Sequence, residues 1–147
     1  MDRPSAFIDS SVFIAALLSS SGGSFYILNN LADSVIFKTN NYVLDEINDV
    51  LNVKFSGQYN LYSTLFLLLS VAKIVVESNP LKGALKKFAK IISKKDAPIL
   101  AGAISGCDYL ITLDNEFLNE KVIGLARSKN LEILKPKDFI QLFGKDA

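Results

Sequence analysis

Short apolar segments alternate with helix-forming segments along the whole chain, and this alternation restricts the fold more than any other feature. The strand-like segments are residues 6–8, 34–39, 72–77, 108–113 and 130–134. They are rich in Ile, Val and Phe, and helical periodicity fills the intervals between them. Parallel strands need such helical crossovers, and strands that are apolar on both sides suit a sheet covered on both faces. The sequence therefore predicts an α/β fold, a three-layer α/β/α sandwich with a central parallel sheet of about five strands.

The composition is that of one compact domain. Half of the 147 residues are apolar, and no linker or internal repeat interrupts the pattern, so residues 1–147 are expected to form a single domain. Two apolar stretches, 12–24 and 65–76, resemble membrane signals. The first follows Asp2 and Asp9 instead of positive residues, and the second is shorter than the roughly 20 residues of a bilayer span. We therefore expect no membrane partner.

The chain contains no histidine, and this absence excludes several kinds of catalysis. Ser–His–Asp and Cys–His chemistry, histidine acid–base catalysis and histidine-ligated zinc all need that side chain. The single cysteine, Cys107, cannot form an intramolecular disulfide and fits a reducing, cytoplasmic location. We expect it to be a small buried hydrophobe. An enzyme of this composition must use carboxylates, lysines, hydroxyls or a hard cation such as Mg²⁺ or Mn²⁺ bound by oxygen atoms.

Four carboxylates occupy positions that can bring them to one edge of the expected sheet. Asp9 follows the first strand and Asp114 the fourth, while Glu46 and Asp96 lie near the beginnings of helices. Ligand sites of open α/β sheets lie beyond the carboxyl ends of the strands, so neighbouring first and fourth strands would place Asp9 and Asp114 in one crevice. Two carboxylates 4 Å apart repel by roughly 4 kcal/mol at an effective dielectric of about 20. Protonation or a divalent cation must therefore neutralise some of this charge.

Each of these carboxylates also has an ordinary structural explanation. Asp9 and Asp114 suit helix caps, and Asp96 suits the first turn of a helix. Glu46 suits an acidic, solvated helix face. From the residues alone, these structural explanations and one shared site both stay open.

Four segments, FIDSSVFIAAL, NYVLDEI, KKDAPILAGAI and DYLITLDNEF, resemble motifs of the PIN domain family in order and in rough spacing. The closing segment LEILKPKDFIQLF is similar to the usual ending of that family, so the resemblance covers nearly the whole chain. It is strongest for the VapC-like toxins of prokaryotic toxin–antitoxin pairs. The resemblance implies a PIN-like, flavodoxin-like three-layer fold and the activity of a metal-dependent ribonuclease.

The resemblance also implies roles for individual residues. The family's four catalytic and metal-binding acids are matched by Asp9, Glu46, Asp96 and Asp114. Glu46 is preferred to Asp45 because it directly precedes an isoleucine, as the family pattern requires. Ser10 and Thr112 match hydroxyls that support the metal or its water. The chain departs from the pattern at Ser11, where this branch often has Asn, and in the two lysines that precede the third acid.

A lysine-rich segment, residues 81–95, ends directly before Asp96 and contains no acid. Its lysines are Lys82, Lys86, Lys87, Lys90, Lys94 and Lys95. They are candidates for binding the RNA backbone without sequence preference, and Lys82, Lys86 and Lys90 are spaced to share one helix face. A solvated helix face is the alternative, and both interpretations can hold together. The formal net charge of +1 gives no information about partners.

More than one function remains open from the sequence. The leading hypothesis is a Mg²⁺- or Mn²⁺-dependent endonuclease that cleaves single-stranded RNA, with an antitoxin protein and a second copy of the chain, in a homodimer or a larger oligomer, as implied partners. The alternatives are an RNA-processing PIN nuclease outside a toxin–antitoxin pair and a PIN-fold binding module without catalysis. A phosphatase with an aspartate nucleophile needs a second Asp two residues after Asp9, where the chain has Ser11. Tyr42, Tyr59 and Tyr62 have rings that can stack on bases, although scattered tyrosines usually pack at the rim of a fold.

Overall fold

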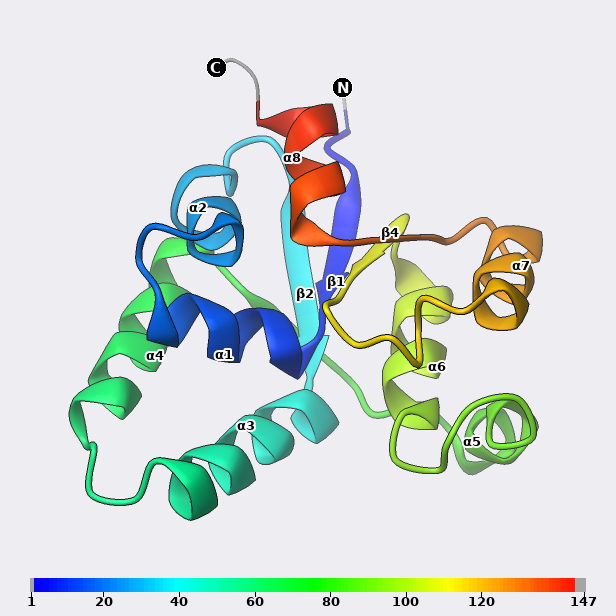
Figure 1. The fold of residues 1–147 in the computed structure, drawn as a ribbon. Coiled ribbons are helices and arrows are strands. Elements are labelled where there is room, and N and C mark those ends of the chain that lie inside the picture. Colours follow the sequence, from blue (N-terminus) through cyan, green and yellow to red (C-terminus); the bar gives the residue numbers. More distant parts are fainter. Residues whose placement is uncertain (1, 145–147) are drawn as a thin grey trace.

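The centre of the molecule is a five-stranded parallel sheet (Figure 1). The computed structural model describes residues 2–144. The strands are β1 (Ser5–Ile8), β2 (Ile36–Asn40), β3 (Val75–Glu77), β4 (Tyr109–Ile111) and β5 (Glu132–Leu134). Their order across the sheet is β3-β2-β1-β4-β5, and all neighbouring strands are parallel. The order differs from the 2-1-3-4-5 order of flavodoxin itself, and it makes β1 and β4 neighbours at the point where the direction of winding reverses.

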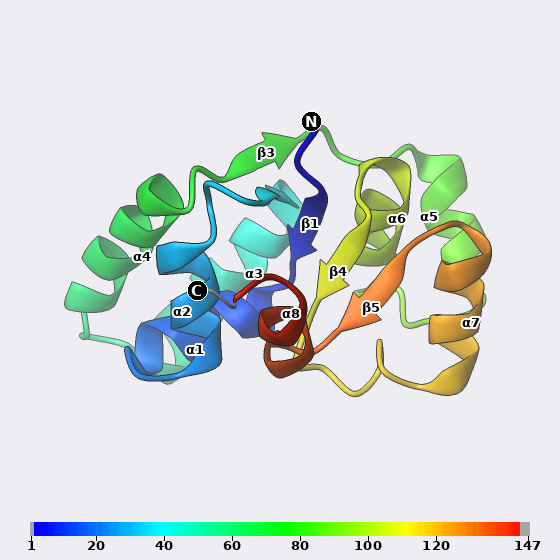
Figure 2. The ribbon, with the colours of Figure 1, turned by 90° about the horizontal axis from the view of Figure 1, so that it is seen from above.

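Helices cover both faces of this sheet. Within residues 2–144 they are α1 (Ser10–Leu18), α2 (Gly23–Asn30), α3 (Asn41–Lys54), α4 (Asn60–Val71), α5 (Lys82–Phe88), α6 (Ala97–Gly106), α7 (Glu120–Ser128) and α8 (Pro136–Phe143). Figures 1 and 2 show α1, α2, α4 and α8 on one side of the sheet and α5, α6 and α7 on the other. Helix α3 lies across the edge at which β2 ends (Figure 1). The expected three-layer α/β/α fold around about five parallel strands is therefore confirmed.

The central strand lies at the middle of the hydrophobic core. Ala6, Phe7 and Ile8 of β1 are fully buried, because β1 has a strand on each side and helices on both faces. This environment explains why the strand is apolar throughout instead of alternating. Within residues 2–144 no single helix is long and apolar enough to cross a bilayer; α1 and α2 meet that criterion only together, as a pair bent by 100°.

Two boundaries differ from the sequence expectation. The third strand begins at Val75 instead of residue 72, because α4 continues to Val71 and Lys73 turns the chain with a φ of 54°. Helix α5 ends at Phe88, so Lys90 lies outside it. The expectation that Lys82, Lys86 and Lys90 share one helix face was wrong, because the helix is too short to include the third lysine.

Candidate functional site

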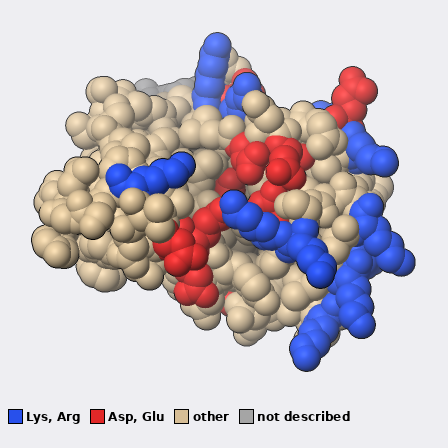
Figure 3. Space-filling view, turned by 60° about the horizontal axis from the view of Figure 1, so that its bottom comes forward, with Lys and Arg blue, Asp and Glu red and all other residues tan. Residues whose placement is uncertain are grey.

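All four candidate carboxylates lie at the edge of the sheet where the strands end. Asp9 directly follows β1, and its N–H donates to the Ile111 carbonyl at 3.1 Å. Ile8 pairs in register with Ile111, so the residues that follow β1 and β4 lie side by side. Figure 3 looks onto this side of the molecule and shows acidic side chains grouped in the middle, with basic side chains beside them. The condition that the sequence left open, that the first and fourth strands are neighbours, is met.

Asp9 is a buried carboxylate held by neutral groups. Its exposed fraction is 2%, and its Oδ2 accepts hydrogen bonds from Thr112 Oγ1 at 2.7 Å and Ser11 Oγ at 2.9 Å. Its Oδ1 accepts from the Ser10 N–H at 2.8 Å, which makes Asp9 the N-cap of α1 as well. None of the ion pairs within residues 2–144 includes Asp9. Burial raises the pKa of Asp9, its hydrogen bonds oppose that rise, and the charge of Glu46 adds to it.

Glu46 connects Asp9 to the lysine-rich segment. It lies on α3, and its Oε1 accepts a hydrogen bond from Ser10 Oγ at 2.6 Å. Its Oε2 forms an ion pair with Lys95 Nζ at 3.0 Å. The hydrogen bond from Lys95 to Glu46 and the charge of that carboxylate raise the pKa of Lys95. The neighbouring Asp45 is exposed, so Glu46 is the acid of this helix that faces the edge.

Asp96 and Asp114 complete the acidic edge. Asp96 is 4% exposed, and its Oδ2 accepts a hydrogen bond from Ser93 Oγ at 3.0 Å. Burial raises the pKa of Asp96 to about 6, and the charges of Asp114, Glu116 and Asp9 contribute to that rise. Asp114 is half-buried, its N–H donates to Thr112 Oγ1 at 3.0 Å, and its Oδ1 accepts from the Glu116 N–H at 2.9 Å. The hydroxyl of Thr112 thus connects the Asp9 carboxylate with the Asp114 backbone.

These carboxylates lie at one edge of the sheet, but they are not close enough to one another to form a complete set of metal ligands. Within residues 2–144 no group of three acidic, histidine or cysteine side chains is placed to hold one metal ion. Mg²⁺ commonly keeps several waters and binds through one or two carboxylates and substrate phosphates. An all-oxygen set with a buried, unpaired Asp9 carboxylate therefore fits a hard and partly hydrated cation, in the donor chemistry and in the charge.

Sequence reasoning missed several groups at this edge. Ser11 was left without a role, yet its Oγ donates to Asp9 and accepts the Leu113 N–H at 3.0 Å. Ser93 was not considered, although a serine three residues before an aspartate is a common local hydrogen-bonding pattern. Glu116 follows Asp114 by two residues and was not considered, because the segment after Asp114 was expected to be a short helical stretch. The ion pair between Lys95 and Glu46 depends on the tertiary fold and has no local sequence pattern.

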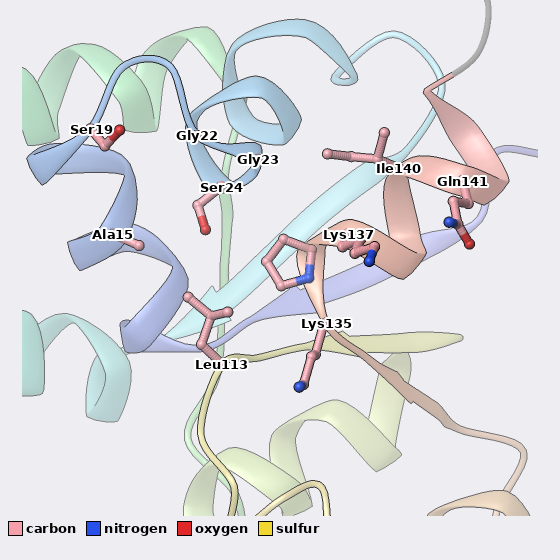
Figure 4. Close-up of a pocket in the computed structure, with 11 residues that line it drawn as sticks. Ala15, Ser19, Gly22, Gly23, Ser24, Leu113, Lys135, Lys137, Ile140 and Gln141 are labelled. Atoms are coloured by element: carbon pink, nitrogen blue, oxygen red, sulfur yellow. The ribbon is translucent and has the colours of Figure 1, made fainter.

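A separate cavity of about 650 Å³ lies between α1, α2 and the beginning of α8 (Figure 4). Ala15, Leu113, Pro136 and Ile140 form much of its lining, and the cationic groups at its edge are Lys135 and Lys137. It is lined by no carboxylate. The acidic edge, and not this cavity, has the groups needed for catalysis.

Without divalent cations, Asp96→Asn is expected to stabilise the protein above pH 6. Folding raises the pKa of the Asp96 carboxyl from 3.8 to about 6, so the wild type loses stability as the pH rises between these values. Asn keeps the oxygen that accepts from Ser93 but carries no charge. In EDTA at pH 7.5 the variant should melt a few degrees above the wild type, and most of the difference should disappear at pH 4. Equal melting temperatures at pH 7.5 would contradict the assigned pKa.

Two solved structures have the same fold. A chain of VapBC2 from Rickettsia felis, bound to a DNA fragment from their promoter, matches with a TM-score of 0.67 and 19% identity over 89% of this chain and 98% of that chain. PAE2754 from Pyrobaculum aerophilum matches with a TM-score of 0.64 and 16% identity over 96% of this chain and 97% of that chain. No family model and no curated protein matches the sequence. The chain therefore shares the fold of these two structures, and this fold agrees with the PIN-like fold that the resemblance in the motifs implies.

Proposed function

We propose that this protein is a metal-dependent ribonuclease that cleaves single-stranded RNA, as the toxin of a toxin–antitoxin pair. The observation that carries the proposal is Asp9, a buried carboxylate that forms no ion pair with any residue from 2 to 144 and lies at the carboxyl edge of a PIN-type sheet. Burial disfavours the charged form of Asp9 until a proton or a cation neutralises it. Burial also raises the pKa of the nearby Asp96, so one cation would relieve the same cost for both carboxyls.

The residues that would hold Mg²⁺ or Mn²⁺ are Asp9, Asp96, Asp114 and Glu46. When bound, such a cation lowers the pKa of a coordinated water and offsets the charge of the phosphate. The protein's own hydroxyls orient the ligands: Thr112 and Ser11 hold Asp9, and Ser10 holds Glu46. Metal-ligating carboxylates are generally held by hydrogen bonds of this kind, and loss of the partner typically weakens metal binding or activity.

The lysine-rich segment would bind the RNA backbone. Lys95 already contacts the acidic edge through Glu46, and the neighbouring Lys94 is exposed beside it. Lysines in this position attract phosphates without selecting a sequence, which suits a nuclease whose chemistry acts on the backbone. The segment also reduces the repulsion between RNA and the carboxylates.

Protein partners form the remaining part of the proposal. Phe66 and Leu67 of α4 are 65% and 64% exposed, and apolar surface of this kind is typical of contacts with other chains. We propose an antitoxin protein as the partner, by analogy with the VapBC2 assembly, and a homodimer or larger oligomer of this chain. A cytoplasmic location stays a prediction from the sequence.

Cleavage of single-stranded RNA is expected to require Mg²⁺ or Mn²⁺. Purified protein is incubated with an end-labelled RNA oligonucleotide in Mn²⁺, in excess EDTA, and in EDTA followed by an excess of Mn²⁺. Fragments should form in the first and third samples only, because the proposed mechanism needs a bound cation to lower the pKa of the attacking water. Cleavage that survives EDTA would refute the metal mechanism. RNA binding without any turnover would favour a PIN-fold binding module instead.

A further inference from the structure

A groove beside the acidic edge runs between the beginning of α3 and helices α5 and α6. It consists of two adjoining cavities of about 320 Å³ and 280 Å³, which share Tyr42, Lys94 and Pro98 in their linings. The first cavity includes Glu46 and so opens onto the acidic edge. The groove therefore begins at a proposed metal ligand and continues away from it along the lysine-rich segment.

The far half of the groove is an apolar slot with cations at its rim. Leu85, Ala89, Pro98 and the ring of Tyr42 line it, and its charged groups are Lys86 and Lys94. Tyr42 is 38% exposed, so part of its ring is open to a ligand. Aromatic rings stack on nucleobases of any sequence, and lysines hold the adjoining phosphates. An apolar slot with two lysines matches one nucleotide of a single strand better than it matches an apolar peptide.

One buried side chain, that of Asn40, forms hydrogen bonds to both walls of the slot. Asn40 is fully buried and accepts the Val43 N–H with its Oδ1 at 3.2 Å, which caps α3 two residues before Tyr42. Its Nδ2 donates to the Pro98 carbonyl at 3.3 Å. The same residue thus sets the position of Tyr42 on α3 and of Pro98 on α6. A groove held in this way exists before a ligand binds, which lowers the entropic cost of binding.

The charges of the groove favour one orientation of a bound strand. The α3 wall carries Asp45 and Asp49, whereas the opposite wall carries Lys94 and Lys95. Phosphates are repelled by the first wall and attracted by the second. Glu46 lies four residues after Tyr42, one helical turn away on the same side of α3. A base on Tyr42 would therefore be close to the acidic edge, with its phosphate on the lysine side.

We infer that this groove binds one nucleotide of single-stranded RNA next to the phosphate that is cleaved. The base stacks on Tyr42 against Pro98, and Lys86 and Lys94 bind the adjoining phosphate. The inference rests on the proposed function, because it names a subsite for the same substrate. It makes Tyr42 a substrate-binding residue and gives the strand a fixed position relative to Glu46.

A tryptophan reporter tests the stacking directly, because the chain contains no tryptophan. Tyr42→Trp is made in the Asp9→Asn background, so that RNA is not cut, and is titrated with a single-stranded RNA oligonucleotide. We expect saturable quenching of its emission. The matched control is Tyr59→Trp: Tyr59 is 78% exposed beyond the other end of α3, whose 14 residues span about 20 Å. Polyphosphate, which lacks bases, should compete with RNA for the lysines and should not itself quench the Tyr42→Trp reporter.

The kinetic test uses the active protein. Tyr42→Ala should raise the KM for a short RNA by roughly ten-fold with little change in kcat, since one stacked base is lost, and Tyr42→Phe should keep the wild-type KM. If the wild type cleaves RNA but Tyr42→Ala has an unchanged KM, or if both tryptophan reporters are quenched alike, the groove inference is wrong and the proposed function stands. If RNA quenches only the Tyr42→Trp reporter and the wild type cleaves no RNA, the groove stands and the nuclease proposal fails.

Discussion

Asp9→Asn is expected to lower RNA cleavage by at least about 10³-fold without unfolding the protein. Asp9 is the most enclosed of the carboxylates, and a loss of about 4 kcal/mol of charge stabilisation at the phosphate corresponds to that factor. Asn has the same shape and keeps an oxygen for the Ser10 N–H. The hydroxyls of Thr112 and Ser11, which donate to the carboxylate, can accept from the amide instead. Initial rates in Mn²⁺ measure the effect.

Stability measurements separate this loss from misfolding. Because burial raises the pKa of Asp9, its charge destabilises the metal-free fold at neutral pH, and Asn removes that charge. In EDTA the variant should therefore melt at or above the wild-type temperature, while Mn²⁺ should raise the melting temperature of the wild type only. Asp33→Asn is the matched control, because Asp33 is exposed and lies before β2, at the opposite edge of the sheet, and this variant should keep full activity. An Asp9→Asn protein with more than a tenth of wild-type activity would exclude Asp9 as a ligand of the catalytic metal.

The layers of the fold could be predicted from the sequence because a strand that is buried on both faces is apolar at successive positions. Ala6, Phe7 and Ile8 are apolar without alternation, which only a covered parallel sheet explains well. Element ends were less predictable. Lys73 adopts a positive φ, although it is neither glycine nor asparagine, the residues that usually indicate such a turn. The strand β3 therefore begins at Val75, later than expected. Such a turn is decided by packing around the residue and not by its type.

The candidate site was predictable in its positions and unpredictable in its contacts. Residues directly after parallel strands lie at one edge of the sheet, so strand ends alone predicted the positions of Asp9 and Asp114, while the resemblance in the motifs implied their roles. The hydrogen bonds of Ser11 and Ser93 depend on side-chain rotamers that no periodicity encodes. The ion pair of Lys95 with Glu46 joins two segments that only the folded chain brings together. The distances between the carboxylates also depend on the folded chain. For this reason the sequence alone suggested a tighter cluster of carboxylates than the fold has.

Asn40→Ala is expected to cost about 2–4 kcal/mol of stability, a larger loss than any other substitution named above should cause. The change removes the cap of α3, so the N–H of the fully buried Val43 loses its partner, and it also removes the hydrogen bond from Asn40 to the Pro98 carbonyl. The site is also tightly packed: a Cβ on Gly102 would lie 2.8 Å from Asn40 Nδ2 and 3.0 Å from Phe7 Cε2. Urea denaturation followed by circular dichroism gives the free energy of unfolding.

Asn119→Ala is the matched control for this loss. Asn119 caps α7 with the same pair of bonds, accepting the Val122 N–H at 3.0 Å and donating to the Glu116 carbonyl at 2.7 Å, but it is exposed. Water can replace both bonds there, so the control should lose only about 1 kcal/mol. Because Asn40 joins the helices that carry Glu46 and Asp96, Asn40→Ala should also weaken RNA cleavage while it is still folded. If Asn40→Ala and Asn119→Ala lower the free energy of unfolding equally, the hydrogen bond from Asn40 to Pro98 contributes nothing to stability. Packing alone would then set the distance between the carboxylates of Glu46 and Asp96.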